Sequence, residues 1–586
     1  MGLDKGSIHI RFRDQSNKIH EYFFKDPIDI IETYDLKSVK DCLTQSEQAS
    51  TKGYYVVGFV SYEAASAFDE RLETQYATRV PLVWFGIYDR KQDIQLFDNY
   101  IDDHYQVGEW IADNNYKEFE ENISNIKSNI KKGNTYQTNY TIRLKTTFDG
   151  STASLYKELC SNQKAAYSAY ICLGDIEVLS VSPELFFEYR KNTIITKPMK
   201  GTIARGRWHE EDIAKINELR NTPKEQAENI MIVDLLRNDL GRIARTNTVQ
   251  VTKLFEVEKY PNVFQMTSEI IATTNVNLVE IFESLFPCGS VTGAPKISTM
   301  KLIKELEKEP RGIYCGTIGL LLPYNHYIFN VSIRTVVVDK LVNKAIYGVG
   351  SGITWDSSVD GEYRELLQKA SILKKKNNEF RIIDWMRLDC DHYNLLESHL
   401  ENIKNTADYF DYPYDHEQLK STLMKIKESN NGVQEVYIQI FRDGKIQVRC
   451  NPLKLSYEIK NAKIVGIPAD RNNVFQFHKT SYLNLSQSIN QDSSDVSLYY
   501  NMEHEITQFC SGNVVVKLGG DYITPPIECG VIQGTFRDAL LKQGKITERK
   551  ILASQLKRAQ EIWLINSVDG WVKVAIDKRY YELLEA

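Results

Sequence analysis

Hydrophobic and polar positions follow two different spacings along the chain. Apolar runs at 54–68 and 80–89 are typical of strands, and two more runs on either side of the polar tip at 190–192 predict a hairpin. Because such strands alternate with helical segments, the first part of the chain is expected to be a mixed α/β domain. Helical spacing of apolar positions marks three segments, at 116–133, 222–244 and 357–376.

The second part of the chain continues the same mixture. Residues 393–415 have the spacing of an amphipathic helix, and 433–451 predict a hairpin that turns at Asp443-Gly444. A polar, cationic run at 374–379 lies between the two parts and predicts a linker. We therefore expect two domains, at 1–373 and 380–586, as suits a chain of 586 residues.

Composition narrows the classes of protein. A formal net charge of -6 with 26% charged residues gives no sign of a nucleic-acid or anionic-membrane partner. The nine cysteines are dispersed without metal-type spacing, which fits thiols in a reducing compartment. No run approaches the roughly 18 apolar residues of a membrane span, and the first residues lack an apolar export segment. A cytoplasmic location is the expectation.

Lys200 stands between Pro198 and the pair Gly201-Thr202, where the backbone is held on one side and free on the other. A fixed, desolvated lysine can lose its proton and act as a nucleophile. The predicted hairpin brings Glu184, at the start of one limb, to the same end as Lys200. The alternative is a surface lysine in a turn and a solvated carboxylate on an edge strand.

Three further carboxylates lie on two predicted helices. Glu228 belongs to the segment at 222–244, and Glu362 and Glu365 share one face of the later helix because they are three positions apart. Brought into one pocket, these three groups would suit a hard divalent cation such as magnesium. Glutamates on helices are usually only solvated, so that reading stays open.

Two glycine-rich loops suggest an anion site. One carries Thr292 and Gly293 immediately before a predicted helix, where free backbone N–H groups face one way. The other comprises Gly350, Ser351 and Gly352, and follows a strand-like run that contains Arg334. Such loops can bind a carboxylate closely.

A second lysine marks the C-terminal part. Lys479 precedes Thr480 at the start of a predicted helix that follows 479, and small polar turns occur at Gly534-Thr535 and Asn566-Ser567. A lysine with two such turns could hold a phosphorylated aldehyde cofactor such as pyridoxal 5'-phosphate.

From about Gly53 to Lys375 the chain resembles the chorismate-utilising enzymes, the family of anthranilate synthase component I and aminodeoxychorismate synthase component I. The motifs that carry the resemblance occur in the family's order: SPELF, KPMKGT, AENIMIVDLLRNDLGR, GSVTGAPK, SIRTVVV, GSGI and EYRE. Lysine at position 200 is typical of the aminodeoxychorismate branch, whereas anthranilate synthases carry alanine there.

The resemblance implies a role for each candidate. Lys200 would attack C2 of chorismate as the 4-hydroxyl leaves, and ammonia would then enter at C4 and expel the lysine. Glu184 would be the general acid/base. Two positions of this chain depart from the family's pattern. Gln265 stands where a histidine is common and Leu320 where a tyrosine is common, and both positions line the pocket in relatives. The magnesium ligands would be Glu228, Glu362 and Glu365, and the carboxylate-binding elements Arg334, Gly350, Ser351, Gly352, Thr292 and Gly293.

From Ile382 to about Val574 the chain resembles fold-type IV pyridoxal-phosphate enzymes, in particular the aminodeoxychorismate lyases. Lys479 matches the lysine that bonds the cofactor, and Gly534-Thr535 and Asn566-Ser567 match phosphate-binding turns. Gln508 stands where the family has a glutamate facing the pyridine nitrogen, and Asn402 stands where it has a phosphate-binding arginine. A neutral amide weakens the electron sink, which an elimination that forms an aromatic ring can tolerate.

Together these resemblances imply an α/β (α+β) chain. The first domain would be two packed antiparallel sheets with outer helices, and the second a smaller two-lobed α+β unit. The implied function is amination of chorismate at C4, with Mg²⁺, followed by pyruvate elimination to p-aminobenzoate, a folate precursor. The sequence shows no Cys-His-Glu glutaminase arrangement, so a separate glutamine amidotransferase subunit would supply ammonia. Anthranilate or salicylate-type synthesis, and a C-terminal half that serves only for docking or regulation, remain alternatives.

Overall fold

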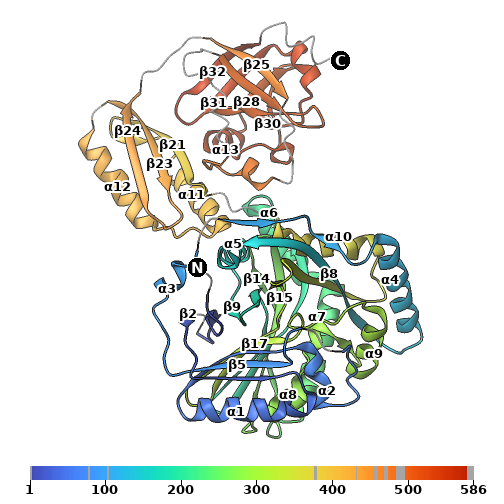
Figure 1. Ribbon diagram of the computed structural model, residues 1–586. Coiled ribbons are helices and arrows are strands. Elements are labelled where there is room, and N and C mark those ends of the chain that lie inside the picture. Colours follow the sequence, from blue (N-terminus) through green and yellow to red (C-terminus); the bar gives the residue numbers. More distant parts are fainter. Residues whose placement is uncertain are drawn as a thin grey trace. The chain divides into compact units, whose positions relative to one another are not determined.

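The computed structural model describes residues 3–16, 18–76, 79–101, 104–374, 379–430, 432–453, 459–466, 473–482 and 495–576. The chain divides into two compact units (Figure 1). One consists of residues 1–204 and 216–377, and the other of residues 205–215 and 378–586. Residues 375–378, most of the predicted linker, lie outside the described part of the chain.

The first unit contains two large antiparallel sheets. In the first sheet the order is β16 (Gly293–Ala294), β8 (Gln137–Gly150), β20 (Lys344–Ile353), β19 (Thr335–Asp339), β10 (Ile176–Ser182), β9 (Tyr167–Cys172), β1 (Ile8–Arg13) and β2 (Ile19–Phe24), with β6 (Tyr105–Val107) and β7 (Ile111–Ala112) paired to β8. In the second it is β13 (Met199–Ala204), β15 (Val263–Thr273), β12 (Thr193–Lys197), β11 (Leu185–Arg190), β18 (His326–Asn330), β17 (Thr317–Leu322), β4 (Tyr55–Val60), β5 (Val83–Tyr88) and β3 (Asp29–Thr33), with β14 (Gln250–Lys259) paired to β15.

A buried apolar layer joins these sheets face to face. Ile171 and Val178 from the first sheet cluster with Phe59 and Ile318 from the second. Burial of such side chains, each worth about 1.5–3 kcal/mol, holds the layers together. The prediction of two packed antiparallel sheets is confirmed.

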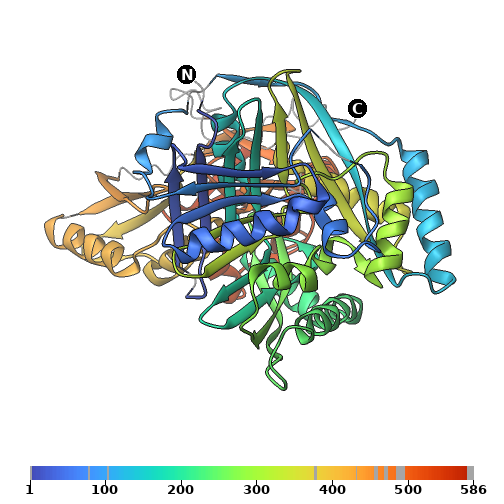
Figure 2. The ribbon, with the colours of Figure 1, turned by 60° about the horizontal axis from the view of Figure 1, so that its bottom comes forward.

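Helices cover the outer faces of both sheets. Helix α1 (Val39–Thr51) lies along β3, β4 and β5 (Figure 2). It packs there with α7 (Pro223–Gly241) and α8 (Leu278–Leu285) in one core, while α4 (Tyr116–Lys131), α5 (Thr152–Gln163) and α10 (Val359–Ala370) pack with the first sheet in another. The helices predicted at 116–133 and 222–244 are thus confirmed, and within the segment predicted at 357–376 the helix spans 359–370, with 375 and 376 outside the described residues. None of the described helices is both long and apolar enough to cross a membrane.

The strand prediction at 54–68 is right only in its first half. After β4 the chain forms two short helical pieces, η2 (Tyr62–Ala64) and α2 (Ala65–Phe68). Their residues are mostly buried. A short buried helical turn gives the same continuous apolar run as a buried strand, so spacing alone could not separate the two.

The predicted hairpin is present as β11 and β12. Leu185 pairs with Lys197, and Lys191 and Asn192 at the tip have positive φ values of 51° and 62°. Pro198 follows β12, and Lys200 lies on the next strand, β13, which pairs with β15. Lys200 therefore reaches its place through a third strand rather than at the end of the hairpin itself.

The second unit contains two smaller sheets. The antiparallel sheet β22 (His392–Tyr393), β21 (Ile382–Asp389), β23 (Val433–Ile440) and β24 (Ile446–Pro452) packs with α11 (Leu396–Phe410) and α12 (His416–Ser429). The mixed sheet has the order β27 (Ile506–Phe509), β26 (Asp495–Tyr500), β25 (Lys460–Gly466), β32 (Gly570–Ile576), β31 (Glu561–Asn566), β28 (Gly512–Leu518), β29 (Asp521–Thr524) and β30 (Thr547–Glu548).

This arrangement confirms the two-lobed α+β prediction for the second unit. The predicted hairpin at 433–451 is β23 and β24, with Gly444 at φ 87° in its turn. The segment 479–482 is described and is not helical, and most of the helix predicted after it falls in 483–494, outside the described residues.

Candidate functional site

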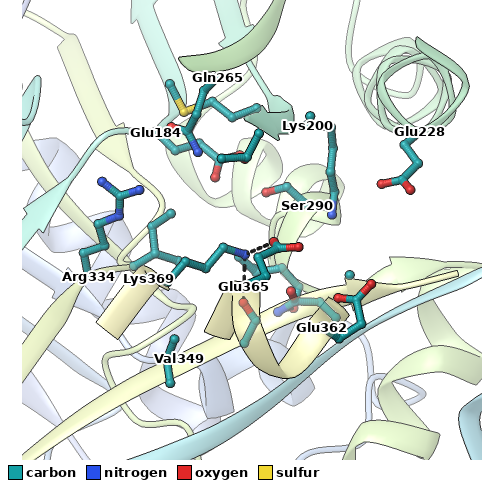
Figure 3. Close-up of a pocket in the computed structure, with 18 of the residues that line it drawn as sticks. Glu184, Lys200, Glu228, Gln265, Ser290, Arg334, Val349, Glu362, Glu365 and Lys369 are labelled. Carbon is teal, nitrogen blue, oxygen red and sulfur yellow. Dashed lines mark hydrogen bonds and ion pairs between the residues drawn. The ribbon is translucent and has the colours of Figure 1, made fainter. Parts of the chain in front are cut away.

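The first unit contains a deep polar cavity between β13, β20, α7 and α10 (Figure 3). Lys200 extends into it, and the carboxylates of Glu228, Glu362 and Glu365 face the same space (Figure 3). Of the residues predicted from sequence, the lining includes Glu184, Lys200, Glu228, Arg334, Gly350, Gly352, Glu362 and Glu365.

The backbone around Lys200 explains the glycine beside it. Strand β13 shifts register against β15 between Met199 and Thr202, and Gly201 within that bulge has a φ of 93°. A side chain at Gly201 would be strained in this conformation and would approach Glu225 and Met266. The Asn229 amide donates to the Lys200 carbonyl at 3.3 Å, which ties the bulge to α7.

The Lys200 amine is placed against a backbone that leaves room for it. A Cβ added to Gly352 on β20 would stand 2.6 Å from Lys200 Nζ. Within the described part of the chain, no carboxylate oxygen lies within 4 Å of that nitrogen. Lys200 is therefore an amine in an acidic cavity without a direct ion-pair partner.

Glu184 lies in the two-residue link between β10 and β11 and is almost fully buried, at 3% exposure. Burial raises the pKa of Glu184 to about 7, although Ser290 and Lys200 oppose the shift. Its Oε1 is buried without a hydrogen-bond partner. A carboxylic acid that is still half protonated near neutral pH can give a proton to a leaving group.

The predicted magnesium ligands share the cavity but differ in state. Burial raises the pKa of Glu228, and Glu362 and Glu365 add to the shift while Lys200 and Lys224 oppose it. Glu362 is buried, with an Oε2 that has no hydrogen-bond partner. Hard carboxylate oxygens on two helices are a donor set that fits Mg²⁺. Among the described residues, no three acidic, histidine or cysteine side chains are close enough to hold one ion, so these groups face one cavity without converging on a point.

Lys369 is a cavity residue that sequence reasoning missed. Its Nζ pairs with Glu365 at 2.7 Å and donates to the Gly350 carbonyl at 2.9 Å (Figure 3). The charge of Lys369 lowers the pKa of Glu365. Burial raises that pKa, but its effect is smaller. The spacing of four positions on α10 was a signal that could have identified it.

The predicted anion loops contribute unequally. Arg334 lines the cavity with a φ of 51°, a conformation that is strained for a side chain of this size, and burial lowers its pKa. Gly350 and Gly352 also line it, but Ser351 between them points to the other face of β20, where its hydroxyl is buried.

The other predicted loop reaches the cavity two residues earlier than expected. Thr292 and Gly293 are not among the lining residues, while Ser290 and Val291 are. Gly293 is paired with Thr138 in the short bridge to β8, and Thr292 is fully buried with its hydroxyl on the Cys288 carbonyl at 3.1 Å. These two residues shape the loop behind the wall.

Of the two residues that depart from the family's pattern, Gln265 and Leu320, only the first lines the cavity. Gln265 lines the cavity, and its Oε1 is buried without a partner. Leu320 does not line it, because it belongs to the apolar layer between the two sheets.

The second unit contains its own cavity, lined by residues of both of its sheets and by the start of α13 (Thr535–Lys542). All the side chains predicted there from sequence meet in it. They are Lys479, Gln508, Gly534, Thr535, Asn566 and Ser567.

Lys479 is engaged by a buried carboxylate. Its Nζ donates to Asp384 Oδ1 at 2.5 Å, and Asp384 Oδ2 takes a second bond from His399 Nδ1 at 2.6 Å. Asp384 and His399 had no signal in the sequence, because they lie about 80 to 95 positions before Lys479 and on other elements.

Gln508 can offer only a donor to the cavity. Its Oε1 accepts the Ile532 N–H at 2.8 Å, so the amide NH₂ is the end left for a ligand. An NH₂ group can bind an unprotonated pyridine nitrogen, whereas a carboxylate would bind a protonated one.

Hydroxyl groups and the start of α13 are the groups in this cavity that could bind the phosphate of a cofactor. Thr535 begins α13, and its Oγ1 accepts a bond from Asn402 at 3.3 Å. Asn566 instead folds onto its own turn, where its Oδ1 accepts the N–H groups of Val568 and Asp569. The lysine, the amide donor and the hydroxyls fit pyridoxal phosphate by the chemistry of the donor set, while Asn402 does not line this cavity and reaches the set only through Thr535.

Comparison with known proteins follows these two units. Residues 9–375 match the chorismate binding enzyme family and residues 381–576 the amino-transferase class IV family. The chain belongs to the chorismate binding enzymes. The family fold is also seen in the crystal structure of anthranilate synthase component I from Streptococcus pneumoniae TIGR4, with a TM-score of 0.51 and 24% identity over 64% of this chain and 91% of that one.

Among relatives of this chorismate binding enzyme is aminodeoxychorismate synthase component 1 of Klebsiella aerogenes, 36% identical over 45% of this chain and 58% of that protein. Anthranilate synthase component 1 of Saccharolobus solfataricus is 30% identical over 61% of this chain and 86% of that protein. The chain thus spans little more than half of the first relative's length. It combines a domain similar to aminodeoxychorismate synthase component 1 with an amino-transferase class IV domain, and the second implies pyridoxal phosphate.

Proposed function

We propose that this chain makes p-aminobenzoate in two steps, amination of chorismate at C4 in the first unit and elimination of pyruvate in the second. The observation that carries the first step is the Lys200 amine, which has no carboxylate oxygen within 4 Å among the described residues and shares its cavity with Glu184, whose pKa burial raises to about 7. An amine held in this way can form a bond with the ring of the substrate.

The proposed amination has two substitutions. Lys200 Nζ forms a bond to C2 of chorismate, the ring double bonds shift, and the 4-hydroxyl leaves with the proton of Glu184 as water. Ammonia then forms a bond to C4, the double bonds shift back, and the C2–N bond to Lys200 breaks. While Lys200 is bonded to C2, ammonia can add only at C4. The presence of the lysine therefore favours aminodeoxychorismate over anthranilate.

Mg²⁺ and cationic groups would hold the substrate carboxylates. Glu228, Glu362 and Glu365 are the proposed metal ligands, and the ion would neutralise one carboxylate. Arg334 and the backbone at Gly350 and Gly352 would bind the other, because all three residues line the cavity.

In the second unit, pyridoxal phosphate would supply an electron sink for breaking the bond to the pyruvate group. Lys479 would hold and release the cofactor and move the proton. Gln508 would donate to the pyridine nitrogen, and Thr535 and Ser567 would bind the phosphate. The weaker sink that Gln508 implies is sufficient because elimination creates an aromatic ring.

The nitrogen source is proposed to be a separate glutamine amidotransferase subunit. Free ammonium should replace it in the test tube. The whole chain incubated with chorismate, ammonium, Mg²⁺ and pyridoxal phosphate should yield p-aminobenzoate, detected by liquid chromatography and mass spectrometry.

Variants assign the two steps. Lys479→Ala should accumulate 4-amino-4-deoxychorismate, and Lys200→Ala should make neither product. Anthranilate or salicylate as the main product of the unmodified chain would overturn the amination proposal, and p-aminobenzoate formed at the same rate by Lys479→Ala would overturn the lyase proposal.

A further inference from the structure

Asp384 and His399 form a buried polar cluster with Lys479. Asp384 is 2% exposed and His399 is fully buried, yet both are polar. Each oxygen of the Asp384 carboxylate has its own donor, Lys479 Nζ at 2.5 Å and His399 Nδ1 at 2.6 Å. A carboxylate buried to this degree is costly unless both of its oxygens are paired, so the three groups form one unit.

Main-chain hydrogen bonds also hold this cluster together. The stretch 479–481 runs antiparallel to the start of β21: Ile383 N–H donates to the Lys479 carbonyl at 3.0 Å, and Ser481 N–H donates to the Arg381 carbonyl at 2.9 Å. Ile382 and Thr480 form a bridge between the same segments. Lys479 is therefore held beside Asp384 by main-chain pairing as well as by charge.

His399 orients the carboxylate and contributes little else. It lies on α11, and its Nε2 is buried without a hydrogen-bond partner. The bond to Asp384 thus requires the proton on Nδ1. The Thr535 hydroxyl lies 3.4 Å from the same nitrogen, which links the cluster to the first residue of α13.

The charge state of Asp384 is set by its partners. Burial alone would raise the pKa of Asp384, but Lys479 and His399 outweigh it and hold the pKa well below the ordinary value. The carboxylate is therefore ionised while Lys479 is an ammonium. Once Lys479 gives up its positive charge, the largest of these stabilising interactions is lost and the carboxylate becomes a better proton acceptor.

We propose that Asp384 is the positioning residue of Lys479 and takes its proton, with His399 holding Asp384 in place. This inference rests on the proposed lyase function. An ammonium cannot bond to an aldehyde carbon, so Lys479 Nζ first passes one proton to Asp384 Oδ1, and the nitrogen lone pair becomes available. When the lysine is released later, the proton returns along the same 2.5 Å contact.

Carbamylation tests the pair without cofactor or substrate. The whole chain is treated with cyanate at fixed pH, and modification of Lys479 is followed by peptide mass spectrometry. A carboxylate in contact favours the ammonium form of an amine, so its removal favours the neutral form, which is the one that reacts with cyanate. Asp384→Asn should therefore react about tenfold faster at Lys479, while Asp384→Glu, which keeps the charge, should stay within about twofold of the unmodified chain.

The matched control is Asp389→Asn. Asp389 also lies on β21, and it pairs with Arg387 rather than with Lys479. It should leave the rate at Lys479 unchanged. Asp384→Ser provides a second neutral variant if the asparagine disturbs folding, as judged by thermal unfolding. Equal rates in a folded neutral variant and in the unmodified chain would overturn the inference.

A cofactor titration separates this inference from the lyase proposal. With pyridoxal phosphate added, the visible absorbance of the bound cofactor is followed against pH. Failure of the unmodified chain to bind the cofactor would sink the lyase function and, with it, the role given to Asp384. If the cofactor binds and the pH midpoint of its absorbance change is the same in the unmodified chain and in Asp384→Asn, only the role given to Asp384 is contradicted. A midpoint shifted by about one pH unit or more supports both.

Discussion

The two units each place one lysine in a cavity, but in opposite electrostatic settings. Lys200 faces several carboxylates but has none within 4 Å in the described part of the chain, whereas Lys479 donates a hydrogen bond to Asp384 at 2.5 Å. The first amine faces cavity space in which a substrate carbon could lie. The second is held in place by a buried partner, to which we infer that it passes its proton. The difference matches a lysine that bonds substrate directly and a lysine that would hold a cofactor.

The surroundings differ in the same sense. The first cavity is polar and strongly charged, because four cationic side chains and five glutamates line it: Lys200, Lys224, Lys369 and Arg334, and Glu184, Glu225, Glu228, Glu362 and Glu365. The second has a larger apolar share of its wall, and Lys479 is its one lysine or arginine among the described residues. A dicarboxylate with a metal suits the first, and a flat aromatic ring suits the second.

The largest expected effect comes from exchanging the two lysines for alanine. Lys200→Ala should lower amination by about 10³-fold, some 4 kcal/mol of transition-state stabilisation. It should leave conversion of added 4-amino-4-deoxychorismate unchanged. Lys479→Ala should do the reverse. Product analysis with each substrate checks both, and loss of both activities in either variant would contradict the division of labour.

Glu184→Gln should lower amination by about 10²-fold, because a general acid contributes about 10²–10⁴. The pH profile is the sharper readout. The acid works when protonated, so with a pKa of about 7 activity should fall as pH rises through 7, and this limb should vanish in the variant. An unchanged limb in Glu184→Gln would show that another group donates the proton. Glu280→Gln, at the start of α8 and outside the cavity, is the control.

Gly352→Ala should cost about tenfold in amination, because its Cβ would stand 2.2 Å from Gln137 Nε2 and 2.6 Å from Lys200 Nζ and so displace both groups. The matched control is Gly241→Ala at the end of α7, where an added Cβ meets nothing within 4 Å. Steady-state rates with ammonium measure both. Equal rates for Gly352→Ala and the control would mean that the amine works from another position.

The smallest expected effect concerns Lys369, the partner of Glu365 in the first cavity. Lys369→Gln frees Glu365 from its 2.7 Å partner, so Mg²⁺ should bind about two- to fivefold more tightly, the value of a half-exposed ion pair of about 0.5–1 kcal/mol. Calorimetric titration checks the affinity. Lys117→Gln, whose ion pair lies on the outer surface of α4, should change nothing. Weaker Mg²⁺ binding in Lys369→Gln would assign Glu365 a role other than metal ligand.

Sequence predicted most of what regular spacing and local motifs encode. The helices α4, α7 and α10 and the hairpin β11–β12 follow from apolar periodicity and turn residues. Lys200 and Glu184 also meet in one cavity as expected, although the route through β13 was not foreseen because pairing with β15 spans more than 60 positions.

The missed parts depend on contacts between distant segments or on which way a side chain points. Asp384 reaches Lys479 only because 479–481 pairs with β21, and no local pattern announces such pairing. Ser351 turns away from the cavity by the alternation of a strand, which a glycine-rich motif does not reveal. Lys369, in contrast, could have been predicted from the sequence, because it follows Glu365 by four positions on one helix.

The most direct test of the account is to trap the bond at Lys200. The chain is mixed with chorismate and Mg²⁺ in the absence of ammonia, quenched, digested and analysed by mass spectrometry. The peptide that contains Lys200 should gain the mass of chorismate less one water, and Lys200→Ala should show no such gain. Full-rate formation of 4-amino-4-deoxychorismate by Lys200→Ala would contradict the account.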